Sequence, residues 1–545
     1  MGPQASQPQT ASGPAPDGDG DATARPAART PIRIPPRFWW LKRLAVAGVA
    51  YVLLLVGVRL WWGYEADRRL QAEVDAIRSR GEPLFFQDYD LTAPADEDAG
   101  PLIQQAVAAL PPGMSADEPS DLADLLKRGV ECDDVARQFL AKTASARQLL
   151  RAAAQRPRAA WGLQLNSPLN WTNLRWPLEA RQLGKVAATA ALAEYAAGDD
   201  AAALATVRDA LILARHMCDN SPFLVTHSVA VACDSLATST LARMLANVEV
   251  DDAPPQSLLR RRVARVPATR GQLLELRDWL LDEATLQRAL RAACCGERTL
   301  VWDEIGLALA GVRVGPLAMT VRSSVEAALG RVAFDPAVRL RGARCLADMG
   351  WLVAASAAED WMEVRLPTVV LPPEGSLRGL TLFPWESEGL LWSSNLPLRG
   401  HFGLIGERRL TATAIAIRLY ELDHGRRPET LDALVPEYLA AVPRDPFRGG
   451  GGPIGYLRDD EAPRLYCAGI NGIDENGLLV WSSPTRLDFE NSDYPVVFLD
   501  GRAPWEPASP FAEQRVLKIG PPAPGEERQG DAGGADTVTQ DALGE

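Results

Sequence analysis

The chain has 545 residues, of which 47% are hydrophobic, so it is long enough for two or three domains with a sizeable core. Its formal net charge of −13 argues against broad nucleic-acid binding, because phosphate contacts need clustered Lys and Arg side chains. The four histidines leave little room for histidine-based catalysis, and no G-x-S-x-G, Walker or Rossmann pattern occurs. We therefore expect a protein without enzymatic activity.

Both ends of the chain have a composition typical of disorder. Residues 1–36 consist largely of Pro, Ala, Gly, Ser and Asp, without aromatic residues or a periodic apolar pattern. Residues 520–545 have a similar composition. Such segments bury too little apolar surface to offset the entropy of ordering the chain, so we expect two solvated tails.

A membrane span is predicted over residues 39–62. The run Leu44–Val58 contains no charged residue, and Trp pairs stand at both ends of the longer segment. From Trp39 to Trp62 a helix is about 36 Å long, enough to cross a hydrocarbon core of about 30 Å. A buried core helix and a cleaved signal peptide are the alternatives. Trp pairs fit the two membrane interfaces better than a core, and Arg59-Leu60-Trp61-Trp62 does not resemble a cleavage site.

The orientation of this span follows from the flanking charges. Positive residues are slightly more numerous on the N-terminal side, which carries Arg25, Arg29, Arg33, Arg37, Lys42 and Arg43. Because positive flanks stay in the cytoplasm, we expect a single-pass inner-membrane protein with a cytoplasmic N-terminus and the bulk of the chain outside.

The central region, residues 65–362, is predicted to be an all-α domain. It begins with a juxtamembrane helix over 65–80, in which Leu70, Val74 and Ile77 share one face. Further helices are expected over 134–155, 176–197, 200–218, 270–294, 316–330 and 335–361, with another opening at Ser221-Pro222. The hairpin over 190–215 resembles one tetratricopeptide unit. No second copy follows it, which excludes a solenoid.

The seven cysteines include no C-x-x-C pair, which excludes zinc-ribbon and thioredoxin-like sites. Most lie in Ala- and Leu-rich stretches, where cysteine acts as a small hydrophobic residue. One or two disulfides in an oxidising compartment are the alternative.

The C-terminal third is predicted to be a small α+β domain over 401–519, following a Pro-, Gly- and Trp-rich linker over 363–400. A helix up to Gly425, a short helix after Pro428 and strands around 453–458, 464–470 and 495–499 are expected. The fold class is therefore mainly α, with an N-terminal transmembrane helix and a small α+β domain at the C-terminal end.

This C-terminal order resembles the globular head of type II secretion pseudopilins. The matching segments are 419–425, 428–439, 443–447 and 466–472. The chain is similar to uncharacterised single-pass bacterial envelope proteins that carry such a C-terminal domain. The match covers less than a fifth of the chain and supports the fold more than the function. Pseudopilins also carry a leader and a glutamate early in the apolar helix, which this chain lacks, so it is not a processed pseudopilin.

The same resemblance implies a calcium site. In that family the loop after the Tyr-containing strand often binds calcium. The matching residues here are Asp474 and Asp493, with Asn476 and Glu490 close by. Calcium takes six to eight oxygen ligands, which carboxylates and the carbonyls of a Gly-rich loop supply. A solvated acidic turn is the alternative.

Two other groups of polar residues are interpreted as structural. His216 and His227 are expected on different helices, where core or capping roles are favoured over a metal site. Glu275, Asp278 and Asp282 share one helix face, which is typical of a solvated surface.

The function predicted from these observations is that of a membrane-anchored envelope protein with a structural or protein-interaction role. Its partners would be the lipid bilayer and other envelope proteins, without nucleic acid and without a cofactor other than calcium. The alternative is an extracytoplasmic hydrolase with a site between the helical domain and the Trp-rich loop over 374–400.

Overall fold

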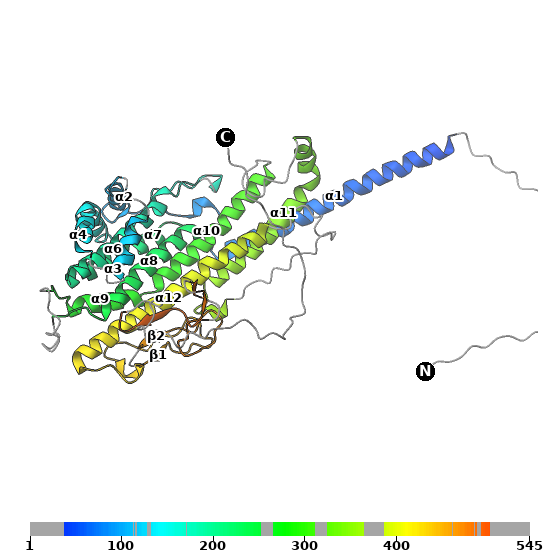
Figure 1. Ribbon diagram of the computed structural model, residues 1–545. Helices are drawn as coiled ribbons and strands as arrows, with labels where there is room; N and C mark the ends of the chain where they lie inside the picture. The colour runs from blue at the N-terminus through cyan, green and yellow to red at the C-terminus, as the bar shows by residue number, and fades with distance from the viewer. Residues whose placement is uncertain are drawn as a thin grey trace, which may run out of the picture. The chain divides into compact units, whose positions relative to one another are not determined.

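The computed structural model describes residues 38–501, apart from 113, 115–116, 128–131, 170–171, 252–264, 311–323, 365–385, 460–461, 484–485 and 488–491. The two predicted tails lie outside these residues. The described part is mainly helical, as the sequence predicts (Figure 1). The chain divides into two compact units, Met1–Trp62 and Gly63–Glu545.

The first unit contains the predicted span. Helix α1 runs from Trp39 to Ser79, and among the described residues it is the one helix long and apolar enough to cross a membrane. Its apolar side chains from Leu44 to Val58 are exposed. The Arg43 guanidinium lies over the Trp39 ring at 3.9 Å, a cation–π contact at the end of the span.

The second unit begins inside the same helix. The sequence predicts a separate juxtamembrane helix, but α1 continues through Gly63 to Ser79, because a single glycine inside a helix costs only about 1 kcal/mol and no proline lies between the two predicted segments. The predicted apolar face is confirmed: Leu70, Val74 and Ile77 are buried. The helix ends before Gly81, whose φ of 67° is one that glycine adopts without strain.

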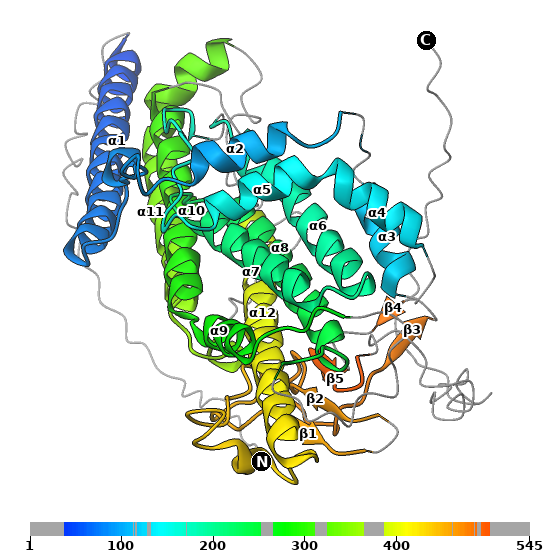
Figure 2. The same ribbon diagram turned by 90° about the vertical axis from the view of Figure 1, so that its left-hand side faces the viewer.

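Three helices form the centre of the second unit. They are α6 (Arg175–Ala196), α7 (Asp200–Cys218) and α8 (Leu224–Leu245), which pack against one another (Figure 2). The predicted hairpin between α6 and α7 is confirmed. Gly198 turns the chain with a φ of 86°, and the Asp199 side chain accepts the Ala202 N–H at the start of α7.

The other helices surround this centre. They are α2 (Gly100–Ala108), α3 (Glu118–Lys127), α4 (Asp133–Lys142), α5 (Ala144–Ala153), α9 (Arg270–Leu281), α10 (Ala284–Leu309) and α11 (Ser324–Ala355). Three boundaries differ from the prediction. The helix expected over 134–155 is divided at Thr143, and the one over 270–294 is divided after Leu281. Helix α11 is continuous from Ser324 to Ala355 and contains Pro336, where two helices over 316–330 and 335–361 were expected. Residues 316–323 of the first expected helix lie outside the described residues.

The last helix, α12 (Glu386–His424), corrects the predicted linker over 363–400. Residues 386–400 are helical, although Pro397 lies inside the helix. Leu398, one residue after this proline, is fully buried. Packing therefore outweighs the local preference of proline against a helix interior. The helix ends as predicted, at Gly425, with a φ of 67°.

An antiparallel sheet has the order β1 (Gly455–Leu457), β2 (Arg464–Tyr466) and β5 (Val496–Phe498). Strands β2 and β5 lie beside α12 (Figure 2). Strands β3 (Trp481–Ser483) and β4 (Arg486–Leu487) form a separate pair. A short 3-10 helix, Leu431–Leu434, corresponds to the helix expected after Pro428.

Helix α12 crosses the predicted boundary at residue 401. It packs against α8 and α9 and against β2 and β5. One hydrophobic core includes Leu70 on α1, Leu241 on α8, Ile415 on α12 and Val497 on β5. The C-terminal strands and the helical bundle therefore share a core.

Candidate functional site

The structure brings three of the four predicted calcium ligands, Asp474, Asn476 and Asp493, together at one loop. The fully buried Asp493 carboxylate accepts the backbone N–H groups of Glu475, Gly477 and Leu478, and the shortest of these bonds, from Gly477, is 2.6 Å. This carboxylate therefore holds the turn closed by accepting hydrogen bonds from the backbone.

Asp474 also has positive and hydrogen-bonding partners. Its carboxylate accepts the Tyr466 hydroxyl at 3.1 Å and the Asn476 N–H at 2.9 Å, and it pairs with the Arg448 guanidinium. Glu490 lies outside the described residues. Within the described ranges, no group of three or more His, Cys, Asp or Glu side chains is arranged to hold a metal ion. Calcium at this loop stays a prediction.

The acidic face of α9 has the ion pairs of a solvated surface. Glu275, Asp278 and Asp282 pair with Arg208, Arg277 and Arg215, respectively. All three carboxylates are half exposed or more, so these pairs contribute little to stability.

The predicted core role of His216 and His227 is confirmed by their burial. The His216 carbonyl accepts the indole N–H of the buried Trp161 at 3.0 Å. His227 lies near Cys218, whose sulfur is 3.8 Å from Nδ1. Six of the seven cysteines, Cys218 among them, are buried and none is in a disulfide, which supports the interpretation as small hydrophobic residues.

A buried polar layer between α8 and α12 was not predicted. We call it the α8–α12 seam, and it comprises His227, Asp234 and Ser235 on α8 and His401, Glu407 and Arg408 on α12. The sequence carries a signal for it. His227 and Asp234 are seven residues apart, as are His401 and Arg408, so each pair lies on one face of its helix.

An ion pair lies at the centre of the seam. Arg408 and Asp234 are 4% and 3% exposed, and Nη1 is 3.3 Å from Oδ2. Arg408 also donates to the Leu280 carbonyl at 3.0 Å and to the Trp279 carbonyl, both at the end of α9. One guanidinium thus joins α8, α9 and α12.

A buried carboxyl group lies next to this ion pair. Glu407 accepts the Ser235 hydroxyl of α8 at 2.5 Å and the Tyr494 hydroxyl at 3.3 Å. Burial raises the pKa of Glu407 to about 7, since desolvation disfavours the carboxylate. The nearby Asp234 carboxylate raises this pKa further.

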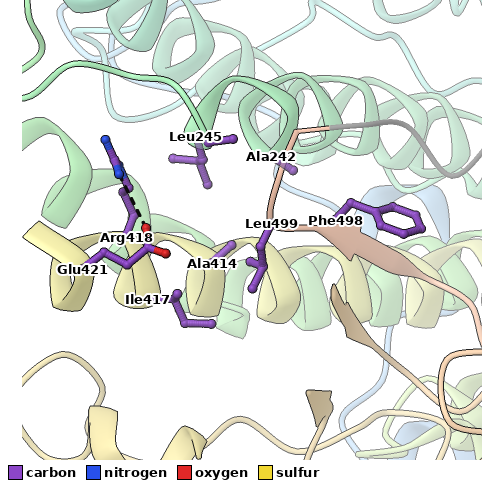
Figure 3. A pocket seen from close by; sticks show the side chains of 9 residues that line it. Ala242, Leu245, Ala414, Ile417, Arg418, Glu421, Phe498 and Leu499 are labelled. Carbon is purple, nitrogen blue, oxygen red and sulfur yellow. Dashed lines mark hydrogen bonds and ion pairs between the residues drawn. The ribbon is translucent and has the colours of Figure 1, made fainter. Parts of the chain in front are cut away.

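A pocket lies beside the C-terminal end of the seam (Figure 3). Its lining residues come from α8, α12 and the end of β5, and they are Ala242, Leu245, Ala246, Ala414, Ile417, Arg418, Glu421, Phe498 and Leu499. Seven of the nine lining residues are apolar, and Arg418 and Glu421 pair with each other at 3.5 Å. The free space of about 20 Å³ is room for about one water molecule, and the lining brings no acid, base and nucleophile together.

Comparison with protein-family models found no match, and comparisons with curated proteins and with solved structures found none. Any functional conclusion therefore rests on the residues themselves.

Proposed function

We propose that this protein is a single-pass, membrane-anchored envelope protein whose body lies outside the cytoplasm and acts in assembly or protein interaction. The observation that carries the proposal is the length of exposed apolar helix in α1. Side chains from Leu44 to Val58 are exposed, and burying them in lipid would remove this apolar surface from water.

The body has features that favour a scaffold. It is built mainly of packed helices around one core, and its buried polar groups join elements that are far apart in sequence. Arg298 is one example. This fully buried side chain pairs with Glu82 at 2.6 Å and donates to the Pro83 carbonyl at 2.9 Å, so α10 is fixed to the segment that follows α1. A fixed segment after the anchor suits a body that presents a defined surface.

The hydrolase alternative has less support. Residues 374–385 of its proposed loop lie outside the described residues, and 386–400 belong to α12. The pocket at α8, α12 and β5 lies away from that segment along α12 and is lined mainly by apolar groups.

The anchor is tested by placing charges in the middle of the span. A central arginine costs about 3 kcal/mol, whereas one near a helix end extends to the interface at little cost. We expect Leu54→Arg with Leu55→Arg to move the protein into the carbonate-soluble fraction, while the control Leu60→Arg stays in the pellet. A double variant that remains in the pellet would contradict the anchor.

The interaction role is tested by crosslinking in native membranes. Purification after crosslinking should recover discrete heteromeric adducts with the wild-type chain, and these adducts should disappear when Leu54 and Leu55 are replaced by arginine. Adducts that are absent from the wild type as well would contradict the interaction role and leave the anchor unaffected.

A further inference from the structure

Two of the four histidines face each other inside the body. The rings of His227 on α8 and His401 on α12 have centroids 5.4 Å apart and are tilted by 36°. Both side chains are buried, at 1% and 0% exposure. His401 also packs edge-on against Phe402, at 5.5 Å. The pair therefore lies in the contact between the bundle and the helix that carries the C-terminal strands.

The surroundings of the pair offer few hydrogen-bonding partners. His401 Nε2 is 3.3 Å from Gln287 Oε1 of α10, and Cys218 of α7 is close to Nδ1 of His227. Within the described part of the chain, His227 Nε2 and His401 Nδ1 are buried and have no hydrogen-bond partner. Among the titratable and charged groups on the packed elements are Cys218 on α7, Asp234 on α8, Glu297 on α10, and Arg399, Glu407 and Arg408 on α12.

This environment disfavours the charged imidazolium. Burial lowers the pKa of His227 to about 4. Burial, together with His227 and the Arg408 guanidinium, holds the pKa of His401 well below its usual range. When the contact opens, both rings meet water and regain a pKa of about 6.5. The open form therefore binds more protons than the closed form at mildly acidic pH, and acid favours opening.

We propose that the His227–His401 pair makes the contact between α8 and α12 sensitive to acid, so that mild acidification releases α12 and the strands packed on it from the helical bundle. Three carboxyl groups act in the opposite direction. Burial raises the pKa values of Glu407, Asp234 and Glu297, so their protonation favours the closed contact in acid. The inference concerns a contact within the chain and holds wherever the body is located.

Amide hydrogen exchange on the full-length protein in detergent tests the proposal, after correction for the intrinsic rate at each pH. The variant is His227→Gln with His401→Gln, and the matched control is His424→Gln on the exposed end of α12. Glu407, Asp234 and Glu297 are present in every protein, so their contributions cancel. Between pH 7 and pH 5, protection in α8 and residues 396–412 should fall at least about tenfold more in the wild type than in the double variant. The control should behave as the wild type does.

An equal loss of protection in the wild type and the double variant would overturn the proposal. If the double variant does not fold at pH 7, the wild type labelled with ¹³C at histidine gives the answer. The signals of His227 and His401 should stay those of neutral imidazole in the protected state, and should change together with the loss of protection in α8 and α12. Titration of the buried pair near pH 6.5, with protection retained, would overturn the proposal.

Discussion

Gly296 on α10 allows a close contact that a single methyl group would abolish. A Cβ atom at this position would lie 1.6 Å from the Pro222 carbonyl oxygen and 2.6 Å from its carbon, in the connection between α7 and α8. Non-bonded Cβ contacts are not shorter than about 3 Å, so α10 and this backbone would have to move apart by more than about 1 Å. Such overpacking costs about 1–3 kcal/mol or more, whereas Ala in a helix gains about 1 kcal/mol over Gly.

We therefore expect Gly296→Ala to lower the free energy of unfolding by about 2 kcal/mol. Gly306→Ala on the same helix is the matched control, because within the described part of the chain no atom outside the neighbouring backbone of α10 lies within 4 Å of its Cβ position. It should be neutral or stabilising by up to about 1 kcal/mol. Urea denaturation of both variants in detergent, followed by tryptophan fluorescence, measures the difference. Equal midpoints for the two variants would refute the contact between α10 and the segment before α8.

Three further predictions concern buried polar groups. Arg408→Met should lower the free energy of unfolding by about 3–5 kcal/mol, because it leaves Asp234 buried and unpaired. Adding Asp234→Leu should recover part of this loss, and strictly additive losses in the double-mutant cycle would argue against a coupled pair. Asp493→Ala should lower the free energy of unfolding by about 3 kcal/mol, and Asp493→Asn by about half of that, since the amide oxygen still accepts backbone N–H groups. Thermal melts with calcium and with chelator test the calcium prediction, and melting temperatures that do not change would contradict it. Glu407 keeps its proton in the folded state up to about pH 7, so its ionisation destabilises the fold as pH rises from about 4.5. The stability of Glu407→Gln relative to the wild type should therefore increase by about 2–3 kcal/mol between pH 5 and pH 8. A stability difference that does not change with pH would contradict the raised pKa.

The sequence correctly predicted the elements that depend on neighbouring residues alone. The uncharged run in α1, the turn at Gly198 and Asp199, and the helix end at Gly425 each depend on residues within a few positions. The strands around Tyr466 and Val497 were found for the same reason. Short-range periodicity and capping are sufficient for such elements.

The errors share a physical cause, which is that tertiary packing outweighed a local preference. A break was expected between residues 330 and 335, and a linker was expected up to residue 400, yet α11 is continuous from Ser324 to Ala355 and α12 already begins at Glu386. Helix α12 also crosses the predicted boundary at residue 401 and shares a core with α8. Packing between segments that far apart in sequence leaves no local trace.

The candidate site was predicted only in part. The sequence identified Asp474 and Asp493 as loop residues. Only the fold shows their partners, which are Arg448 for Asp474 and backbone N–H groups for Asp493. The α8–α12 seam joins residues about 170 positions apart, as in Ser235 with Glu407. The sequence shows the seven-residue spacing of His227 and Asp234 and that of His401 and Arg408. It does not show that the two helices carrying these pairs pack against each other.

The central claim is that α1 anchors a body that lies outside the cytoplasm. Protease treatment of intact spheroplasts, with one epitope at the N-terminus and a second after residue 501, tests it most directly. We predict that the C-terminal epitope and the body are digested while the N-terminal epitope stays protected by the membrane. Protection of the body with loss of the N-terminal epitope, or protection of both epitopes until the spheroplasts are lysed, would contradict the account.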